Sequence, residues 1–308
     1  MNNVDKHASA YVAAIDLGSN SFHLVVTQFT GTEFKKIKKL GCKVQLAAGL
    51  NKDNQLSLEA MQRGWSCLES FAAQLKKYSQ IKVRALATCA LRQAHNRQEF
   101  LTQAERILNV PIELISGEDE ARIIHLGASR TMAKYSSHTL LVDIGGGSTE
   151  IIVAHDNQPQ ALFSLPLGCV TFSRDYFPNG HINATYFAQA VAAAQQHLQP
   201  IAATLKSLGW QYSFGSSGSS SSFVQIMQAR QQGQGSLFSR AQLEQLKRDV
   251  LALSHIDEIQ FAGLKPERRS IFIGGLAIML AVFEALNLNE MRYVDAALRE
   301  GALWSLVV

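Results

Sequence analysis

Two acidic residues flank a glycine-rich turn in the segment TLLVDIGGGSTEIIV, residues 139–153. Asp143 stands before the turn and Glu150 after it, between two apolar runs. Glycines leave the main chain open, and successive N–H groups in such a turn form a site that binds anions. The segment is therefore suited to hold a phosphate group. Its candidate phosphate ligands are Gly145, Gly146, Gly147 and Ser148.

Carboxylates beside a phosphate repel it unless a cation lies between them. Mg²⁺ is suited to this place, because it binds oxygen ligands and is held by one or two carboxylates together with substrate phosphates. We therefore expect a Mg²⁺ (or Mn²⁺) cofactor at Asp143 and Glu150, with Asp16 as a further ligand, directly or through water.

The same plan occurs twice in the chain. AAIDLGSNSFHLVV (13–26) and LLVDIGGGSTEIIV (140–153) each contain an apolar strand ending in Asp, a loop of Gly and Ser, and a second strand. The two aspartates are 127 residues apart in a chain of 308, which indicates an internal duplication with a sheet and helices in each half. The polar stretch 125–137 is the expected boundary. Candidate phosphate ligands in the first loop are Gly18, Ser19, Asn20 and Ser21.

These loops differ from the two common nucleotide-binding fingerprints. Neither loop has the lysine of the GxxxxGK[ST] loop, and each is followed by a strand instead of a helix. Ordinary hairpin turns are the alternative for either loop alone. Two matching loops in matching contexts favour phosphate binding.

Apolar periodicity and capping residues predict the elements around the loops. Strands are expected at 11–18, 21–29, 81–88, 111–116 and 160–168, and helices at 58–78, 97–109, 118–130, 184–198, about 241–254 and 275–286. Ser57 and Asn183 are expected N-caps, and Pro200 is expected to end or kink its helix. Residues 212–223 are expected to run from a strand into a small-residue loop, and 291–304 to form a short strand and a helix.

Composition limits the classes of protein to consider. The chain is 47% apolar with a formal charge of +4, which is too weak to indicate binding of a nucleic-acid polymer. Its longest apolar run, 271–283, is shorter than the ~20 residues of a membrane-spanning helix, and its first residues show no signal peptide. Four scattered cysteines indicate neither a zinc site nor a disulfide framework. We expect a cytoplasmic protein without membrane contact.

Five segments in order, DLGSNSFHLVV, ALATCALRQAHN, ELISGEDEARIIHLG, LVDIGGGSTEIIV and DAALREGAL, resemble the exopolyphosphatase / guanosine pentaphosphate phosphohydrolase (Ppx/GppA) family. The resemblance runs from about residue 11 to 304. It implies an α/β fold of two duplicated actin-like, or sugar-kinase-like (ribonuclease H-like), domains with an interdomain cleft. The expected lobes are 1–127 and 128–308, with a final helix at about 295–306 that can pack back on the N-terminal lobe. The chain stops at Val308, so we expect a short form without the C-terminal helical HD-like domain of longer members.

The resemblance also implies roles for single residues. Glu120 matches the family's catalytic glutamate, which orients or deprotonates the attacking water. Asp143 and Glu150 match the acidic residues that hold metal, and Arg92 matches an arginine that contacts phosphate. The residues of the two loops match the family's phosphate-binding loops.

Several activities remain open at this point. The first expectation is an exopolyphosphatase that releases terminal phosphate from inorganic polyphosphate, and its alternative is a guanosine pentaphosphate (pppGpp) phosphohydrolase. A sugar-kinase-like phosphotransferase or ATPase would use Glu120 as a base toward a substrate hydroxyl. A non-enzymatic, nucleotide-sensing relative of actin is a third class. The expected partners are these phosphate substrates, and a homodimer is one state that the sequence leaves open.

Overall fold

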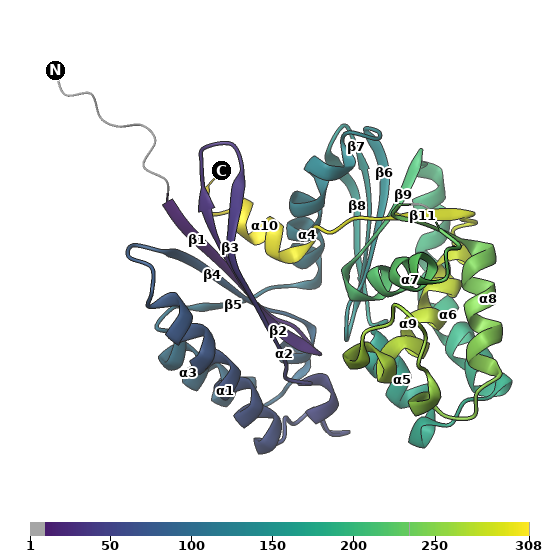
Figure 1. The fold of residues 1–308 in the computed structure, drawn as a ribbon, viewed down its shortest axis with the longest axis horizontal. Coiled ribbons are helices and arrows are strands. Elements are labelled where there is room, and N and C mark those ends of the chain that lie inside the picture. Colours follow the sequence, from purple (N-terminus) through teal and green to yellow (C-terminus); the bar gives the residue numbers. More distant parts are fainter. Residues whose placement is uncertain (1–9, 234, 308) are drawn as a thin grey trace. The chain divides into compact units, whose positions relative to one another are not determined.

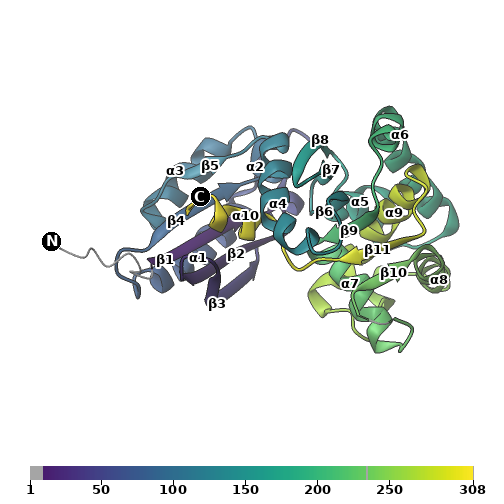
Figure 2. The ribbon, with the colours of Figure 1, turned by 90° about the horizontal axis from the view of Figure 1, so that it is seen from above.

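The computed structural model describes residues 10–233 and 235–307, which form two compact units. One unit contains the described residues up to Ser116 and those from Leu298 onward, and the other is Gly117–Ala297 (Figure 1). The boundary expected after residue 127 falls inside helix α4 (Gly117–Met132), which lies in the second unit. Helix α10 (Leu298–Trp304) packs on β1 of the first unit, where Figure 2 also shows it.

The first unit is built on a five-stranded sheet in the order β3-β2-β1-β4-β5. Its strands are β1 (Ala10–Leu17), β2 (Ser21–Phe29), β3 (Phe34–Lys43), β4 (Lys82–Ala87) and β5 (Ile112–Leu114). Its other helices are η1 (Ala47–Gly49), α1 (Leu58–Leu75), α2 (Cys89–Gln93) and α3 (Arg97–Leu108). The expected cap of α1 is confirmed, because the Ser57 side chain accepts a hydrogen bond from the amide of Ala60.

The second unit is built on a six-stranded sheet in the order β10-β11-β9-β6-β7-β8. Its strands are β6 (His138–Ile144), β7 (Thr149–His155), β8 (Gln158–Leu165), β9 (Tyr212–Ser216), β10 (Leu237–Ser239) and β11 (Glu290–Tyr293). Its helices after α4 are α5 (Cys169–Tyr176), η2 (Pro178–Gly180), α6 (Ala184–Leu208), α7 (Ser217–Ala229), α8 (Arg240–Leu251), η3 (Ile256–Glu258), η4 (Pro266–Arg268) and α9 (Arg269–Ala285).

The two sheets share one topology. In each, a central strand (β1 or β6) pairs antiparallel with the first strand of a meander (β2 or β7), which pairs antiparallel with the next (β3 or β8). On its other side the central strand pairs parallel with β4 or β9. A further parallel strand follows, β5 in one sheet and β11 in the other. The duplication expected from the repeated segment is thus confirmed, and β10 is an addition to the second sheet alone.

Three expectations about elements were wrong. The small-residue loop at 217–223 is the start of α7, because a single left-handed residue, Ser217 (φ 64°), turns the chain from β9 directly into the helix. The helix predicted to end at residue 198 continues to Leu208, eight residues beyond Pro200, since α6 packs along α9 and tertiary contact outweighs the lost N–H donor. Helix α9 begins at Arg269, six residues earlier than predicted.

Helix α9 forms the centre of the second unit. Every residue from Ile271 to Phe283 is buried, as expected of a helix that is apolar on all sides. At Gly274 the helix touches α5, where an added Cβ would stand 2.6 Å from the carbonyl oxygen of Cys169. Among the described residues, no helix is both long enough and apolar enough to cross a bilayer.

Candidate active site

Three predicted carboxylates come together in the second unit. Asp143 near the end of β6 pairs directly with Glu150 of β7, so their side chains lie on the same face of the sheet. Helix α4 packs against β7 and β8 and carries Glu120 in its first turn. All three are buried, with relative exposures of 5%, 1% and 7% for Asp143, Glu150 and Glu120.

The proximity of the three carboxylates changes the pKa of Glu150. Burial raises the pKa of Glu150 well above its ordinary value, and the neighbouring Glu120 and Asp143 carboxylates raise this pKa further. Hydrogen bonds from Ser164 and Ser148 oppose the shift. A cluster of three buried carboxylates therefore favours either a bound proton or a bound cation.

The glycine loop has the close backbone approach that its composition predicts. The amide of Gly145 donates to the carbonyl oxygen of Ser148 (2.9 Å), and a Cβ at position 145 would stand 3.1 Å from that oxygen. The Ser148 side chain turns back to Glu150, which joins the loop to the carboxylate cluster. Gly147 and Ser148 are buried, whereas Gly145 and Gly146 are half-buried.

Helix α5 supports the glycine loop. The amides of Cys169 and Val170, at the start of α5, donate to the carbonyl oxygens of Gly145 and Gly146 (both 3.0 Å). Gly168 lies so close to the loop that a Cβ there would meet the Gly146 oxygen at 2.2 Å. These contacts with the start of α5 therefore fix the conformation of the glycine loop. The sequence did not predict them.

The first unit repeats the hairpin with different side chains. Asp16 pairs with His23, and its carboxylate lies 4.0 Å from the His23 ring nitrogen. A Cβ at Gly18 would stand 2.9 Å from the Ser21 carbonyl, as at Gly145 of the second loop. The backbone carbonyls of Ser19 and Asn20 accept hydrogen bonds from Ala47 and Gln45, and the buried Asn20 Oδ1 has no hydrogen-bond partner.

Arg92 lies in the short helix α2 of the first unit. Its Nη1 donates to the carbonyl oxygen of Ile115 (3.0 Å), and the side chain is half-buried. A guanidinium group has five N–H donors in a planar fork, a geometry that suits phosphate oxygens.

The carboxylate oxygens of the site suit a divalent cation that also binds the phosphate oxygens of the substrate. Among the residues that the structure describes, no group of three or more His, Cys, Asp or Glu side chains could by itself hold a metal ion. Asp143 and Glu150 can supply two hard oxygen ligands, and Mg²⁺ characteristically completes its shell with water and phosphate oxygens. The residues therefore fit a Mg²⁺ that binds together with a phosphate ligand.

Two serines beside the carboxylates were not predicted. Ser164 on β8 donates to Glu150 Oε1 (2.7 Å), and Ser216 on β9 donates to Asp143 Oδ2 (2.5 Å). Both are register partners of the acid that they contact. The pairing of β6 with β9 is not visible in the sequence, so no local signal pointed to Ser216.

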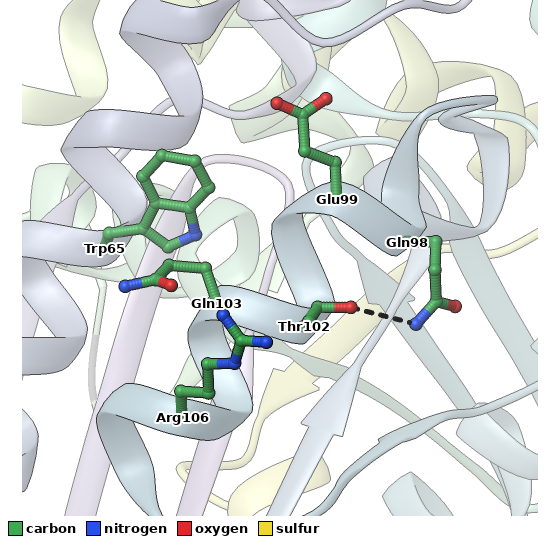
Figure 3. Close-up of a pocket in the computed structure, with 6 residues that line it drawn as sticks. All are labelled: Trp65, Gln98, Glu99, Thr102, Gln103 and Arg106. Carbon is green, nitrogen blue, oxygen red and sulfur yellow. Dashed lines mark hydrogen bonds between the residues drawn. The ribbon is translucent and has the colours of Figure 1, made fainter.

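A surface pocket of about 500 Å³ lies elsewhere, between α1 and α3 of the first unit (Figure 3). Trp65 of α1 stacks on Phe100, and its Nε1 donates to the Phe100 carbonyl oxygen. The remaining lining residues come from α3 and are Gln98, Glu99, Thr102, Gln103 and Arg106. None of them is a predicted site residue, and four of the five are exposed, so this pocket has no place in the chemistry considered below.

Comparison with known proteins settles the family. The sequence profile of the Ppx/GppA phosphatase family matches residues 25–308. The chain belongs to this family. A guanosine-5′-triphosphate,3′-diphosphate pyrophosphatase of Aeromonas salmonicida (strain A449) is 41% identical over 301 residues, which cover 98% of this chain and 60% of that protein. The family member described here thus spans about three fifths of this relative's length.

Solved structures confirm the fold. An exopolyphosphatase-like protein superposes with a TM-score of 0.87 at 24% identity, covering 97% of this chain and 98% of that one. An exopolyphosphatase from Cytophaga hutchinsonii gives 0.86 at 21% identity, with coverages of 96% and 97%. A PPX-GPPA enzyme of Aquifex aeolicus gives 0.78 at 23% identity, with coverages of 96% and 99%. The predicted α/β fold of two duplicated domains is thereby confirmed.

Proposed function

We propose that this chain hydrolyses the terminal phosphoanhydride bond of guanosine 5′-triphosphate 3′-diphosphate and releases orthophosphate. The observation that supports this substrate is the 41% identity, over 98% of the chain, to a guanosine-5′-triphosphate,3′-diphosphate pyrophosphatase. From the sequence alone, polyphosphate ranks first and the guanosine pentaphosphate second. The relative reverses that order.

Glu120 is the proposed catalytic base. It is buried beside Glu150, so a water between it and the terminal phosphate would be held away from bulk solvent. Glu120 would accept a proton from this water while the water oxygen bonds to the terminal phosphorus in line with the breaking P–O bond. The electrons of that bond would pass to the leaving diphosphate oxygen.

The glycine loop and the remaining acids have the proposed role of holding the phosphate. Gly145, Gly146, Gly147 and Ser148 would bind its oxygens. In the first unit, Gly18, Ser19, Asn20, Ser21 and Arg92 keep the phosphate-binding role that the resemblance to the family implies. Asp143 and Glu150 would hold Mg²⁺, which would neutralise negative charge on the phosphate oxygens. Asp16 of the first unit keeps the metal-binding role expected from the repeat. These contacts would stabilise the transition state by positioning the terminal phosphate and neutralising the negative charge on its oxygens.

The test is a substrate panel. Purified protein is incubated with Mg²⁺ and one of three substrates, which are guanosine pentaphosphate, GTP and inorganic polyphosphate. Free orthophosphate is measured over time in each reaction. We expect kcat/KM to be highest for the pentaphosphate. The Glu120→Gln protein, purified in the same way, is the control for contaminating phosphatases and should release no phosphate. Release of phosphate without any acceptor separates hydrolysis from the kinase alternative. No turnover of the pentaphosphate would refute the proposal, and faster turnover of polyphosphate would restore the first expectation.

A further inference from the structure

One transverse row of four residues crosses the second sheet. The strand register pairs Ser164 of β8 with Glu150 of β7, Glu150 with Asp143 of β6, and Asp143 with Ser216 of β9. Residues that are register partners on adjacent strands project their side chains from the same face. Two carboxylates thus stand side by side, with a serine at each end.

Each serine uses its one hydroxyl proton on its neighbouring acid. Ser216 Oγ donates to Asp143 Oδ2 at 2.5 Å, and Ser164 Oγ donates to Glu150 Oε1 at 2.7 Å. Hydrogen bonds to a carboxylate are among the stronger protein hydrogen bonds and define a direction as well as a distance. The strand fixes only the Cα–Cβ direction of each acid, so these bonds select the rotamers beyond it.

The first unit shows the same row without the serines. There the register runs from Gly41 of β3 through His23 and Asp16 to Leu86 of β4. Gly41 and Leu86 carry no side-chain donor, and a histidine stands where the second unit has Glu150. The duplication therefore retained the aspartate in both units, but only the second unit combines a pair of acids with a serine at either end.

We propose that Ser216 and Ser164 are positioning residues that hold Asp143 and Glu150 in the orientation in which the two acids bind the divalent cation and the terminal phosphate. The inference rests on the proposed function only for the identity of the substrate. The row of four residues lies within a single sheet and does not depend on which phosphate compound is the substrate.

The test uses the full chain with matched variants. Ser216→Ala and Ser164→Ala remove the two donors, and Ser164→Thr keeps the hydroxyl at the half-exposed end of the row. Ser222→Ala is the control, since Ser222 is a buried serine of α7 whose hydroxyl donates to the Gly218 carbonyl oxygen within the same helix. Mn²⁺ affinity is measured by electron paramagnetic resonance with Mn²⁺ and inorganic orthophosphate as the only added ligands, and kcat and KM are measured with guanosine pentaphosphate and Mg²⁺.

We expect both Ala variants to bind Mn²⁺ about tenfold more weakly and to lose about tenfold in kcat, as for a lost hydrogen bond to a charged group. KM should change far less than kcat, because the acids act mainly on the transition state. Ser164→Thr and Ser222→Ala should both stay within about twofold of wild type in Mn²⁺ affinity and in kcat, since neither loses a hydroxyl from the row. If Ser216→Ala does not fold, Ser216→Cys keeps the side-chain shape, with a slightly larger atom and a much weaker donor, and should show the same loss.

Three results would overturn the proposal. These are wild-type Mn²⁺ affinity in both Ala variants, an equal loss in Ser222→Ala, or no Mn²⁺ binding by the wild type. A wild type that binds Mn²⁺ but releases no phosphate from the pentaphosphate would refute the proposed substrate. In that case weaker Mn²⁺ binding by Ser216→Ala and Ser164→Ala would still support the positioning role.

Discussion

Gly168 offers a test of the glycine loop that touches none of the proposed chemical groups. It lies just before α5 with ordinary extended backbone angles (φ −118°, ψ 140°), so alanine is allowed there by conformation alone. The obstacle is space. An added Cβ would stand 2.2 Å from the Gly146 oxygen and 2.3 Å from the Gly147 Cα.

The size of the effect follows from these distances. Both contacts are with backbone, so no flexible side chain can yield, and the loop or the start of α5 must move by roughly 1 Å to restore normal packing. Overpacking of this kind costs about 1–3 kcal/mol of stability. A displacement of about 1 Å in groups that position a substrate lowers turnover by about 100-fold. We therefore expect Gly168→Ala to fold with moderately reduced stability and to lose about two orders of magnitude in kcat/KM.

The assay pairs phosphate release with urea unfolding. Gly209→Ala is the control, because Gly209 has open space around it but a positive φ of 69°, so alanine there lowers stability through backbone strain far along the chain from the loop. We expect Gly209→Ala to lose stability and to keep its turnover at temperatures where it is folded. Normal turnover in Gly168→Ala, or an equal loss in both variants, would show that the loop conformation is not what activity depends on.

Three further predictions concern protonation, metal and folding. Burial lowers the pKa of His125 to about 4, so the unfolded chain takes up a proton first as the pH falls, and the folded state loses about 2 kcal/mol between pH 7.5 and pH 5 from this residue. Urea unfolding of His125→Gln should lack that part of the pH dependence, and an unchanged slope would contradict the assignment. Asp143→Asn should raise the Mg²⁺ concentration for half-maximal phosphate release about tenfold or more; an unaltered Mg²⁺ titration would remove Asp143 from the metal site. Asn183→Ala removes the side-chain acceptor for the Tyr186 amide (2.8 Å) and should cost about 1 kcal/mol in thermal or urea unfolding, with no change in turnover of folded protein; a loss of turnover would indicate a role beyond capping.

Local patterns were sufficient to predict much of the fold. The hairpins β1–β2 and β6–β7 each combine largely buried strands with a glycine turn, and the β2 bounds match the predicted 21–29. The capping side chains of Ser57 and Asn183 accept hydrogen bonds from the first turns of their helices, as expected. In these cases the deciding interactions lie within a few residues along the chain.

The partners of the carboxylates could not be predicted in this way. Between β7 and β8 the register shifts by one residue after Val153, so that Ser164, and not Phe163, stands opposite Glu150. A one-residue shift moves every following side chain to the other face, and no turn signal in the sequence specifies this bulge. The pairing of Asp143 with Ser216 joins residues 73 positions apart through a parallel ladder, which depends on the packing of the whole unit.

The same limitation applies to the serine-rich stretch. Its composition is typical of a loop, since serine competes with the backbone for hydrogen bonds. In the structure, Ser217 and Ser219 donate to the carbonyl oxygen of Ile144 on β6, and Ser222 donates to Gly218 within α7. Contacts with a neighbouring strand, together with the left-handed Ser217, thus stabilise a helix that the local sequence does not favour.

The central claim is that Glu120 directs a water molecule onto the terminal phosphorus of the substrate. The most direct measurement is a single turnover of guanosine pentaphosphate in ¹⁸O-labelled water with Mg²⁺, followed by mass spectrometry of both products. The account predicts one ¹⁸O atom in the released orthophosphate, none in the guanosine tetraphosphate, and loss of turnover in Glu120→Gln with pentaphosphate binding preserved. Label in the tetraphosphate, or a Glu120→Gln protein that turns over at the wild-type rate, would contradict it.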